Sequence, residues 1–303
     1  MGIASYIKEI GRGRDGARPL TREQAADLFG QLLDGTVTDL EIGGFCLAMR
    51  IKGETPQEMA GFLDATHQRL CRVPEPADGG VTIVIPSYNG ARKLPLLTPL
   101  LALLLAREGQ RVLIHGTATE SSRVFTSKVL EILEIHAQSA ISSIAPGEVQ
   151  FAPTAVLLPG LQRLLDVRRV VGLRNSAHSL VKLMSPCLGK NLLVSSYTHP
   201  EYAVSMAATF ELMQTHALLL RGTEGESVAD ARRMPQMDGF IAGRKITLQA
   251  AQSGTLATLP DLPQGTDAES AAAYIREVLN GTKMVPESIA KQVEHILHLV
   301  KQL

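Results

Sequence analysis

Hydrophobic residues in the first part of the chain recur at the three- and four-residue spacing of amphipathic helices. In the stretch LTREQAADLFGQLLDG, six apolar side chains fall near one helical face: Leu20, Ala25, Leu28, Phe29, Leu32 and Leu33. Thr21 predicts a helix start, and Gly30, Gly35 and Gly53 predict helix ends. The pattern therefore predicts a small helical domain over residues 1–73.

The pattern changes after CRVPEPADGG at residues 71–80, a Pro-, Gly- and Asp-rich stretch that is typical of a linker. A β-branched run at 81–85, an apolar helix at 98–107 and the run RVLIHG at 111–116 form a β-α-β pattern, which predicts a parallel sheet with helices on its faces. Further predicted strands are TAVLLP at 154–159, NLLVSS at 191–196, HALLLRG at 216–222 and KITLQ at 245–249. The predicted fold class is therefore α/β, with a helical N-terminal domain and a larger α/β domain over 79–303 built on a mainly parallel central sheet.

The stretch RRVVGLRNSAHSLVKLMSP at residues 168–186 has a helical pattern and is expected to pack onto the N-terminal helices, so that residues 165–187 join that domain. In one helix, Arg174, His178 and Lys182 would form a single polar stripe. Between residues 163 and 190 the chain has six Lys or Arg and one acid, a local charge of +5.

A second group of cations lies at the N-terminus. It comprises Lys8, Arg12, Arg14, Arg18 and Arg22. Lys8 and Arg12 are one helical turn apart and either follow a nucleic-acid backbone or balance Glu9. For every basic group in this chain, a solvated helix face is the alternative to a nucleic-acid surface.

Composition limits the possible partners. The 303 residues are 45% hydrophobic and carry thirty Lys and Arg against thirty Asp and Glu, so a nucleic acid would have to be held by local patches rather than by a global field. Three scattered cysteines suggest neither a disulfide framework nor a zinc site, which fits a cytoplasmic protein. The longest apolar run, 94–106, contains two prolines and is too short to span a bilayer, and no signal peptide is evident.

The loop after the first predicted strand, within IPSYNGARKLPLLTPL (85–100), lies where a phosphate site is expected. Thr98 and Pro99 suit the N-cap and first position of the following helix, whose free N–H groups attract anions. The candidate phosphate ligands on this loop are Ser87, Asn89, Gly90, Arg92 and Lys93. The alternative is that the Asn-Gly pair is only a tight turn and the two cations are solvated.

Six stretches in one order carry a family resemblance: EIGRGRDGARPLTREQA, DLEIGGFCLAMRIKGET, IPSYNGARK, GLRNSAHSLVKL, HPEY and RGTEGESVAD. Over nearly the whole chain the sequence resembles the YbiB-like DNA-binding proteins, a branch related to anthranilate phosphoribosyltransferase. The resemblance implies the fold of the nucleoside phosphorylase and phosphoribosyltransferase relatives and a homodimer formed through the helical domains. It also implies a C-terminal helix beyond Leu303.

The resemblance also shows where this sequence departs from the enzymes. Their diphosphate loop GTGGD corresponds to residues 85–89, IPSYN, in which side chains and a proline replace glycines. Their KHGNR motif corresponds to IHGTA, and their Asp-Glu magnesium pair falls at Ser227 and Val228, with Glu224 and Glu226 out of register. Three separate losses argue against phosphoribosyl transfer.

We therefore predict a homodimer that binds single- or double-stranded DNA, and possibly RNA, without sequence preference, catalytic residues, cofactor or metal. The predicted nucleic-acid contacts are Lys8, Arg12, Arg14, Arg92, Lys93, Arg168, Arg169, Arg174, His178 and Lys182; the predicted phosphate ligands are Ser87, Asn89 and Gly90. Arg168 also matches an arginine that contacts the aromatic acid in the enzymes. For Tyr88, Tyr197 and Tyr202, stacking on bases competes with core packing, and His115 and His199 are expected to be structural. The alternative function is that of an anthranilate phosphoribosyltransferase-like glycosyltransferase using phosphoribosyl diphosphate.

Overall fold

The computed structural model describes residues 2–13, 15–255 and 260–303, which form two compact units. The first comprises Met1–Cys71 and Thr154–Pro186, and the second comprises Arg72–Pro153 and Cys187–Leu303. The segment predicted to join the helical domain was 165–187. In the structure this segment begins earlier, at Thr154, and ends at Pro186. No described helix is long and apolar enough to cross a membrane.

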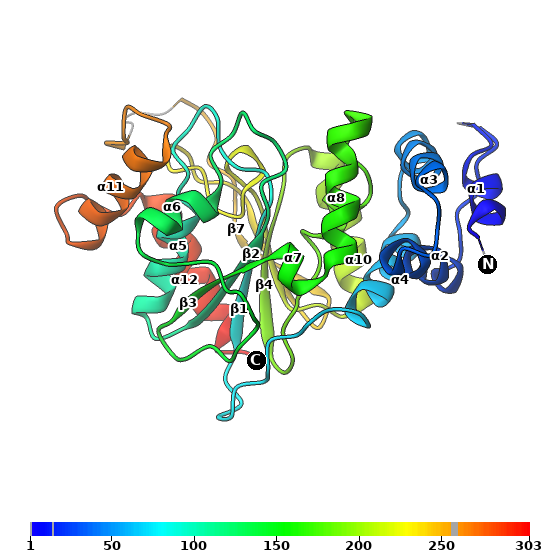
Figure 1. Ribbon diagram of the computed structural model, residues 1–303. Coiled ribbons are helices and arrows are strands. Elements are labelled where there is room, and N and C mark those ends of the chain that lie inside the picture. Colours follow the sequence, from blue (N-terminus) through cyan, green and yellow to red (C-terminus); the bar gives the residue numbers. More distant parts are fainter. Residues whose placement is uncertain (1, 14, 256–259) are drawn as a thin grey trace. The chain divides into compact units, whose positions relative to one another are not determined.

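The first unit is entirely helical (Figure 1). Its helices are α1 (Ala4–Ile10), α2 (Arg22–Asp34), α3 (Asp39–Lys52), α4 (Pro56–His67), α7 (Thr154–Leu157), α8 (Pro159–Val171) and α9 (Ala177–Leu180). Thr21, Thr38 and Thr55 begin α2, α3 and α4, each within a reciprocal capping box. The core contains the rings of Phe29 and Phe62, stacked with centroids 4.6 Å apart.

Two of the three predicted glycine stops are helix C-caps, Gly35 for α2 and Gly53 for α3. The third prediction was wrong, because Gly30 lies inside α2. A Cβ atom there would lie 2.8 Å from Arg69 Nη2, so this glycine makes room for a guanidinium group rather than ending a helix. Arg69 in turn donates to Asp34 at the end of α2.

The second unit contains a seven-stranded sheet covered by helices (Figure 1). Its elements are β1 (Thr82–Ser87), α5 (Thr98–Arg107), β2 (Arg111–Gly116), α6 (Thr126–Ile132), β3 (Val149–Pro153), β4 (Asn191–Tyr197), α10 (Pro200–Met213), β5 (Ala217–Arg221), the 3₁₀ turn η1 (Thr223–Gly225), β6 (Met237–Ile241), β7 (Arg244–Gln249), α11 (Ala268–Leu279) and α12 (Glu287–Val300). The strand order is β3-β2-β1-β4-β5-β6-β7. The first five strands in this order are parallel, and β6 and β7 are antiparallel additions.

Alternate residues of the central strands face two different layers. Ile83 and Ile85 of β1 belong to the core that includes α5, α11 and α12. On the other face lies α10, whose Phe210 packs edge-on against Phe240 of β6 with ring centroids 5.2 Å apart. The central strands are buried on both faces, which confirms the predicted α/β class with a mainly parallel sheet.

Two strand predictions need correction. The run at 154–159 forms α7 and the start of α8, and the strand beside β2 is the preceding β3. The strand β6 was not predicted, because its MDGFI stretch carries an Asp and a Gly that weaken a strand signal. The hairpin between β6 and β7 turns at Ala242 and Gly243, both with positive φ, which is the twist that a two-residue hairpin needs.

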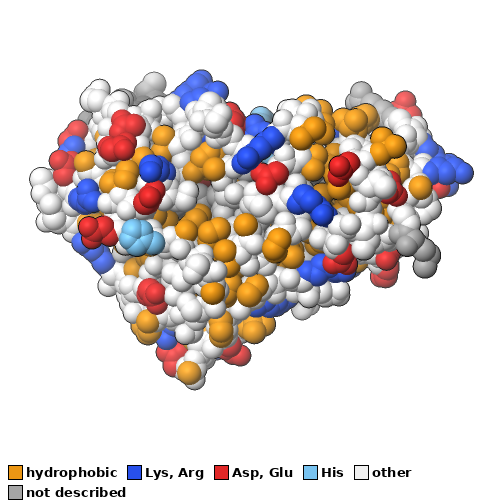
Figure 2. All heavy atoms as spheres, in the orientation of Figure 1, with side chains coloured by type: hydrophobic (Ala, Val, Ile, Leu, Met, Phe, Trp, Pro, Cys, Tyr) orange, Lys and Arg blue, Asp and Glu red, His pale blue; other side chains and the backbone are white. Residues whose placement is uncertain are grey.

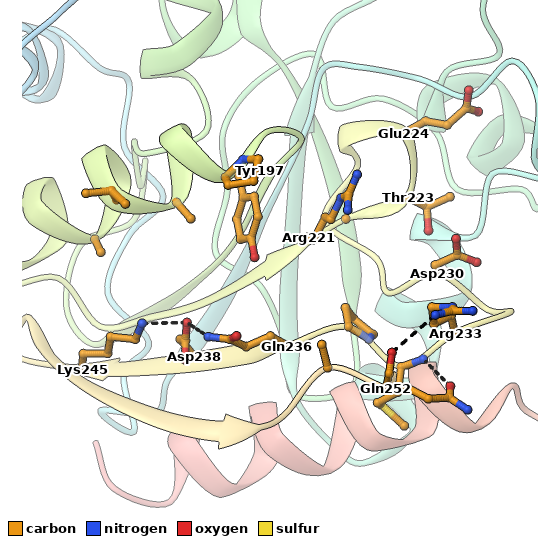
Figure 3. Close-up of a pocket in the computed structure, with 18 of the residues that line it drawn as sticks. Tyr197, Arg221, Thr223, Glu224, Asp230, Arg233, Gln236, Asp238, Lys245 and Gln252 are labelled. Atoms are coloured by element: carbon orange, nitrogen blue, oxygen red, sulfur yellow. Dashed lines mark hydrogen bonds and ion pairs between the residues drawn. The ribbon is translucent and has the colours of Figure 1, made fainter. Parts of the chain in front are cut away.

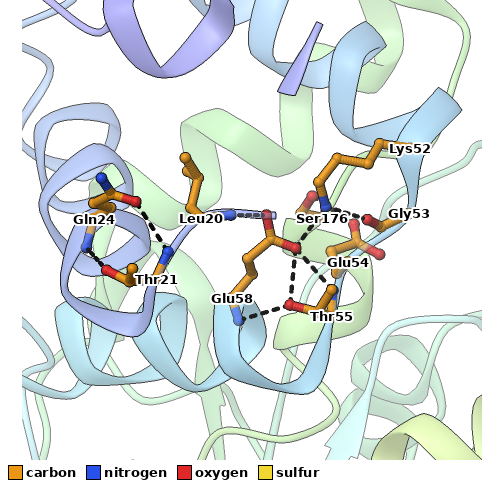
Figure 4. Close-up of polar contacts among 9 residues, drawn as sticks. All are labelled: Leu20, Thr21, Gln24, Lys52, Gly53, Glu54, Thr55, Glu58 and Ser176. Atoms are coloured by element: carbon orange, nitrogen blue, oxygen red, sulfur yellow. Dashed lines mark hydrogen bonds and ion pairs between the residues drawn. The ribbon is translucent and has the colours of Figure 1, made fainter. Parts of the chain in front are cut away.

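A buried carboxylate holds three pieces of the helical unit together (Figure 4). Glu58, with no exposed surface, accepts hydrogen bonds from the Leu20 N–H at 2.9 Å and the Thr55 N–H at 2.9 Å. It also pairs with Lys52 Nζ at 2.6 Å. Since the segment before α2, the end of α3 and the start of α4 all donate to this one side chain, Glu58 fixes how these three segments meet.

We predict that Glu58→Ala lowers the free energy of unfolding by about 3–5 kcal/mol, because Lys52 becomes a buried charge without its partner. Glu58→Gln should cost less, since the amide oxygen still accepts from backbone N–H groups. Urea titration measures both. The matched control is Glu41→Ala, which removes the corresponding capping-box acid of α3 but no buried Lys, and should cost about 1 kcal/mol. Equal losses for Glu58→Ala and Glu41→Ala would contradict the prediction.

Candidate functional site

The candidate site is the loop that leaves the carboxyl end of β1. The chain crosses from β1 to β2 on one side, whereas β4, the other neighbour of β1, leads on to β5 in the opposite direction. Such a reversal of strand order opens a crevice at the carboxyl ends of the strands, where ligands of α/β proteins commonly bind. The loop with the predicted phosphate ligands Ser87, Asn89 and Gly90 starts at this position.

The donors of this loop bind a carboxylate of the chain itself. Glu226 Oε1 accepts the Asn89 N–H at 2.7 Å and the Gly90 N–H at 2.8 Å. Its Oε2 accepts the hydroxyl groups of Ser87 and, at 3.2 Å, of Thr98. Because only 1% of Glu226 is exposed, the carboxylate lies inside the loop as a bound anion would.

A second carboxylate closes the outer part of the same loop. Glu224 Oε2 accepts the backbone N–H groups of Arg92 at 2.7 Å and Lys93 at 3.1 Å. The Glu224 carbonyl accepts the Asn89 side-chain amide at 3.1 Å. The side chains of Arg92 and Lys93 are exposed, so these two cations project from a loop whose backbone is fixed.

Thr98 does not have the capping role that the sequence predicted. The helix α5 begins at Thr98 itself, its N-cap is Leu97, and no side chain caps it. The hydroxyl of Thr98 instead donates to Glu226, which places a negative charge against the first turn of α5. The carboxylate therefore supplies the anion that a helix N-terminus favours.

Tyr88 of the loop is a core residue. It is 3% exposed, and its hydroxyl lies 2.8 Å from Nδ1 of the fully buried His115 on β2. A ring in this position packs inside the unit and is not available for stacking on a base. The expectation that His115 is structural agrees with this contact.

The predicted basic helix at 168–186 is interrupted. The first part, α8, ends at Val171 with Gly172 in the left-handed conformation, and α9 covers only Ala177–Leu180. Arg174 lies in the connection and Lys182 lies after α9, so the continuous polar stripe was wrong. A glycine with positive φ ends the helix at a point that the apolar periodicity alone does not mark.

Three of the predicted residues are nevertheless close together. Burial, followed by the positive charges of Arg174 and Arg168, lowers the pKa of His178 to about 4. His178 Nδ1 lies 3.3 Å from both the backbone nitrogen and the side-chain oxygen of Asn175. His178 is therefore uncharged at pH 7 and adds no positive charge to this cluster.

The remaining predicted cations are spread over both units. Lys8 and Arg12 are exposed on and just after α1, and Arg12 Nη2 pairs with Glu9 at 2.6 Å, as the charge-balancing alternative predicted. Arg169 lies 3.3 Å from Asp166 on α8. Arg14 lies outside the described residues. On the face shown in Figure 2, basic and acidic side chains are interspersed rather than separated by sign.

A large cavity in the second unit was not predicted (Figure 3). Its volume is about 1310 Å³, and its apolar wall comes from Ala203, Val204, Ala207 and Ala208 of α10. Opposite this wall lie polar groups of the β5–β7 region, among them Arg221, Arg233 and Lys245. Lys245 Nζ pairs with Asp238 at 3.0 Å. These cations are far apart in sequence and follow no spacing, so only the fold brings them to one cavity.

The described residues contain no group of three or more His, Cys, Asp or Glu side chains arranged to hold a metal ion. Ser227, at one position of the magnesium pair that the resemblance implied, is 2% exposed and donates to the Pro86 carbonyl at 3.0 Å. Val228, at the other position, is buried in the apolar core. Hydroxyl and alkyl groups with these contacts do not provide the carboxylate oxygens that magnesium needs.

Comparison with known proteins supports a relation to the phosphoribosyltransferases. The helical bundle domain of the glycosyl transferase family matches residues 4–69. Anthranilate phosphoribosyltransferase of Salinispora arenicola is 29% identical over 273 residues, which is 86% of this chain and 76% of the enzyme. The YbiB protein of Escherichia coli is 40% identical over 298 residues, which is 97% of this chain and 92% of that protein.

Solved structures of the enzymes share the fold. Anthranilate phosphoribosyltransferase of Thermus thermophilus has a TM-score of 0.69 at 23% identity, covering 95% of this chain and 85% of the enzyme chain. The enzyme of Saccharomyces cerevisiae, in complex with PRPP and Mg, has a TM-score of 0.70 at 13% identity, covering 99% of this chain and 89% of that chain. At these identities the likeness shows the fold alone.

These likenesses support the glycosyltransferase alternative better than the nucleic-acid prediction, which none of them tests. The predicted resemblance to both groups is confirmed as a relationship of sequence and fold. The chain therefore belongs to the family of the Escherichia coli YbiB protein, a relative of the anthranilate phosphoribosyltransferases.

Proposed function

We propose that this chain binds nucleic acid through Lys and Arg contacts to phosphate, without sequence preference and without transferring a phosphoribosyl group. The observation that carries the proposal is the basic segment of the helical unit. Residues 154–186 contain five Lys or Arg and one acid. A polyanion that neutralises such a cluster releases its own counterions, which drives binding of any sequence.

Like charges in this segment are held near one another. Arg174 and Arg168 both lie near enough to the ring of His178 to lower its pKa, in addition to the larger effect of burial. In this proposal, a phosphate of the nucleic acid accepts hydrogen bonds from guanidinium groups of this segment. Because guanidinium groups donate in a planar fork, they suit phosphate oxygens better than an ammonium does.

The filled loop after β1 argues against the enzymatic use of the fold. A sugar diphosphate would need the N–H groups of Asn89 and Gly90, which already donate to Glu226. The exposed side chains of Arg92 and Lys93 on the same loop remain available to an external phosphate. The predicted phosphate ligands Ser87, Asn89 and Gly90 thus belong to an internal contact, and we propose Arg92 and Lys93 as separate phosphate contacts on the second unit.

We propose that the protein acts as a homodimer formed through α3. Leu40, Leu47 and Ile51 are 86%, 46% and 64% exposed and, at i, i+7 and i+11, share one face of that helix. A Cβ atom added at Gly43 would meet nothing within 4 Å, so the helix surface there is open. A two-fold contact would bury this strip against its copy and repeat each basic segment.

A second candidate function is phosphoribosyl transfer, favoured by the 29% identity to anthranilate phosphoribosyltransferase over 86% of the chain. Under this alternative, Glu226 and Glu224 would have to leave the loop when substrate binds.

We expect the double variant Arg169→Ala, Lys182→Ala to weaken binding to all DNA sequences alike. The slope of log K against log salt should fall in magnitude by about 0.9 for each duplex phosphate that the variant no longer neutralises. Fluorescence anisotropy with single- and double-stranded DNA and RNA at several salt concentrations measures this. The control Lys128→Ala removes an exposed cation of α6 that also pairs with an acid on its own helix, and His178→Gln removes an uncharged ring. Unchanged affinity in the double variant would exclude Arg169 and Lys182 as contacts to the nucleic acid.

The alternative function is tested by adding phosphoribosyl diphosphate and magnesium to the wild-type protein. We expect no change in melting temperature, because the donors of the loop are occupied by Glu226. A true substrate at one hundred times its Kd would stabilise the protein by about 2.7 kcal/mol, which is a shift of several degrees. Such a shift would overturn the proposed function in favour of the enzyme.

We expect Ile51→Glu to convert a dimer to a monomer, since a carboxylate within an apolar contact loses its water on assembly. Light scattering after gel filtration measures the mass. Val204→Glu is the matched control, because Val204 is 72% exposed on α10 of the second unit. A dimer that persists in Ile51→Glu would exclude this face of α3.

A further inference from the structure

The carboxylate of Glu226 makes the contacts that a bound phosphate would make. Two backbone N–H groups donate to one oxygen, at 2.7 and 2.8 Å, and two hydroxyl groups donate to the other. The donors come from the loop after β1 and from the first turn of α5. Successive backbone N–H groups beside a helix N-terminus are a general device for binding anions.

The turn that carries Glu226 is anchored from several sides. Within it, the Thr223 N–H donates to the Val228 carbonyl at 2.9 Å. The fully buried Gln292 of α12 donates to the Ser227 carbonyl at 2.8 Å and accepts the Ala229 N–H at 2.8 Å. Because Gln292 holds Ser227 and Ala229 just after Glu226, the carboxylate is a fixed part of the unit.

The turn that carries Glu226 is closely packed. Gly225 has a φ of +89°, and a Cβ atom there would lie 2.1 Å from Asn89 Nδ2. Glu224, just before it, has a φ of +50° although it is not glycine. The backbone thus accepts an unfavourable conformation at the point where two carboxylates enter the loop, and their hydrogen bonds compensate for it.

We propose that Glu226 is a built-in ligand: its carboxylate occupies an anion site that the loop still possesses, and its removal turns the loop into a binding site for inorganic phosphate. The same four donors then serve a phosphate oxyanion. The backbone that holds them is fixed by contacts that do not involve Glu226, namely Tyr88 to His115 and the Ala91–Val124 bridge.

Electrostatics favours the replacement of the Glu226 carboxylate by a phosphate. In Glu226→Ala, the buried N–H groups of Asn89 and Gly90 lose their acceptor, which costs free energy that an incoming anion recovers. The methyl group of alanine also leaves the volume of the former carboxylate open. In Glu226→Gln the amide oxygen can still accept both N–H groups, and the amide nitrogen can donate to the two hydroxyl oxygens. Glutamine therefore keeps the site filled without the charge.

Equilibrium dialysis with radiolabelled inorganic phosphate, at ionic strength held constant with chloride, tests the proposal. We expect Glu226→Ala to bind one phosphate per chain, and the wild type and Glu226→Gln to bind none. Adding Thr98→Val to Glu226→Ala should weaken phosphate binding several-fold, which locates the site at α5. Glu226→Ala that binds no more phosphate than the wild type, or Glu226→Gln that binds as well as Glu226→Ala, would overturn the proposal.

Stability gives a second readout that does not depend on a well-folded variant. The urea midpoint of Glu226→Ala should lie below that of the wild type in chloride and should rise with phosphate until it saturates. The wild type and Glu226→Gln correct for the general effect of phosphate on folding. If Glu226→Ala is unfolded in chloride, phosphate should restore its circular dichroism spectrum; a chain that stays unfolded at every phosphate concentration contradicts the proposal.

Discussion

The contact between one buried carboxylate and the donors at the end of β1 determines what this fold can do. Glu226 joins the loop after β1, the first turn of α5 and the turn after β5, three pieces that meet only through tertiary structure. In open α/β sheets, ligands commonly bind at the carboxyl ends of the strands where the strand order reverses. In this chain, the carboxylate of Glu226 supplies the negative charge that the hydrogen-bond donors of this region bind.

An internal anion has consequences for charge elsewhere. The backbone N–H groups of the loop donate to Glu226 and Glu224. The side chains of Arg92 and Lys93 take no part in these hydrogen bonds and are exposed at the surface. A phosphate of a polymer can reach such groups without entering the crevice. The architecture of a phosphoribosyltransferase and a surface role for its cations are therefore compatible, because the two depend on different atoms of the same loop.

Sequence patterns predicted the fold where local signals suffice. Apolar β-branched runs located β1 and β2, and α5 has the predicted bounds 98–107. The predictions failed where contacts with residues distant in the sequence determine the local structure. Residues 154–159 form helix rather than strand, and Gly30 lies within α2, where it makes room for Arg69. The anion-binding character of Ser87, Asn89 and Gly90 was visible in the sequence. Its occupant was not, since Glu226 lies 137 residues beyond Asn89 and no local spacing connects them.

The two edges of the sheet are each closed in a different way. The outer side of β3 is covered by the segment at Ala137, which bridges to Phe151, and Gln138 donates its N–H to the Phe151 carbonyl at 2.9 Å. The outer strand at the other end, β7, begins with the exposed cations Arg244 and Lys245. Covered or positively charged margins resist the addition of a strand from another molecule. Continuous sheets through neighbouring copies, the usual route to aggregation of such a domain, are thereby disfavoured.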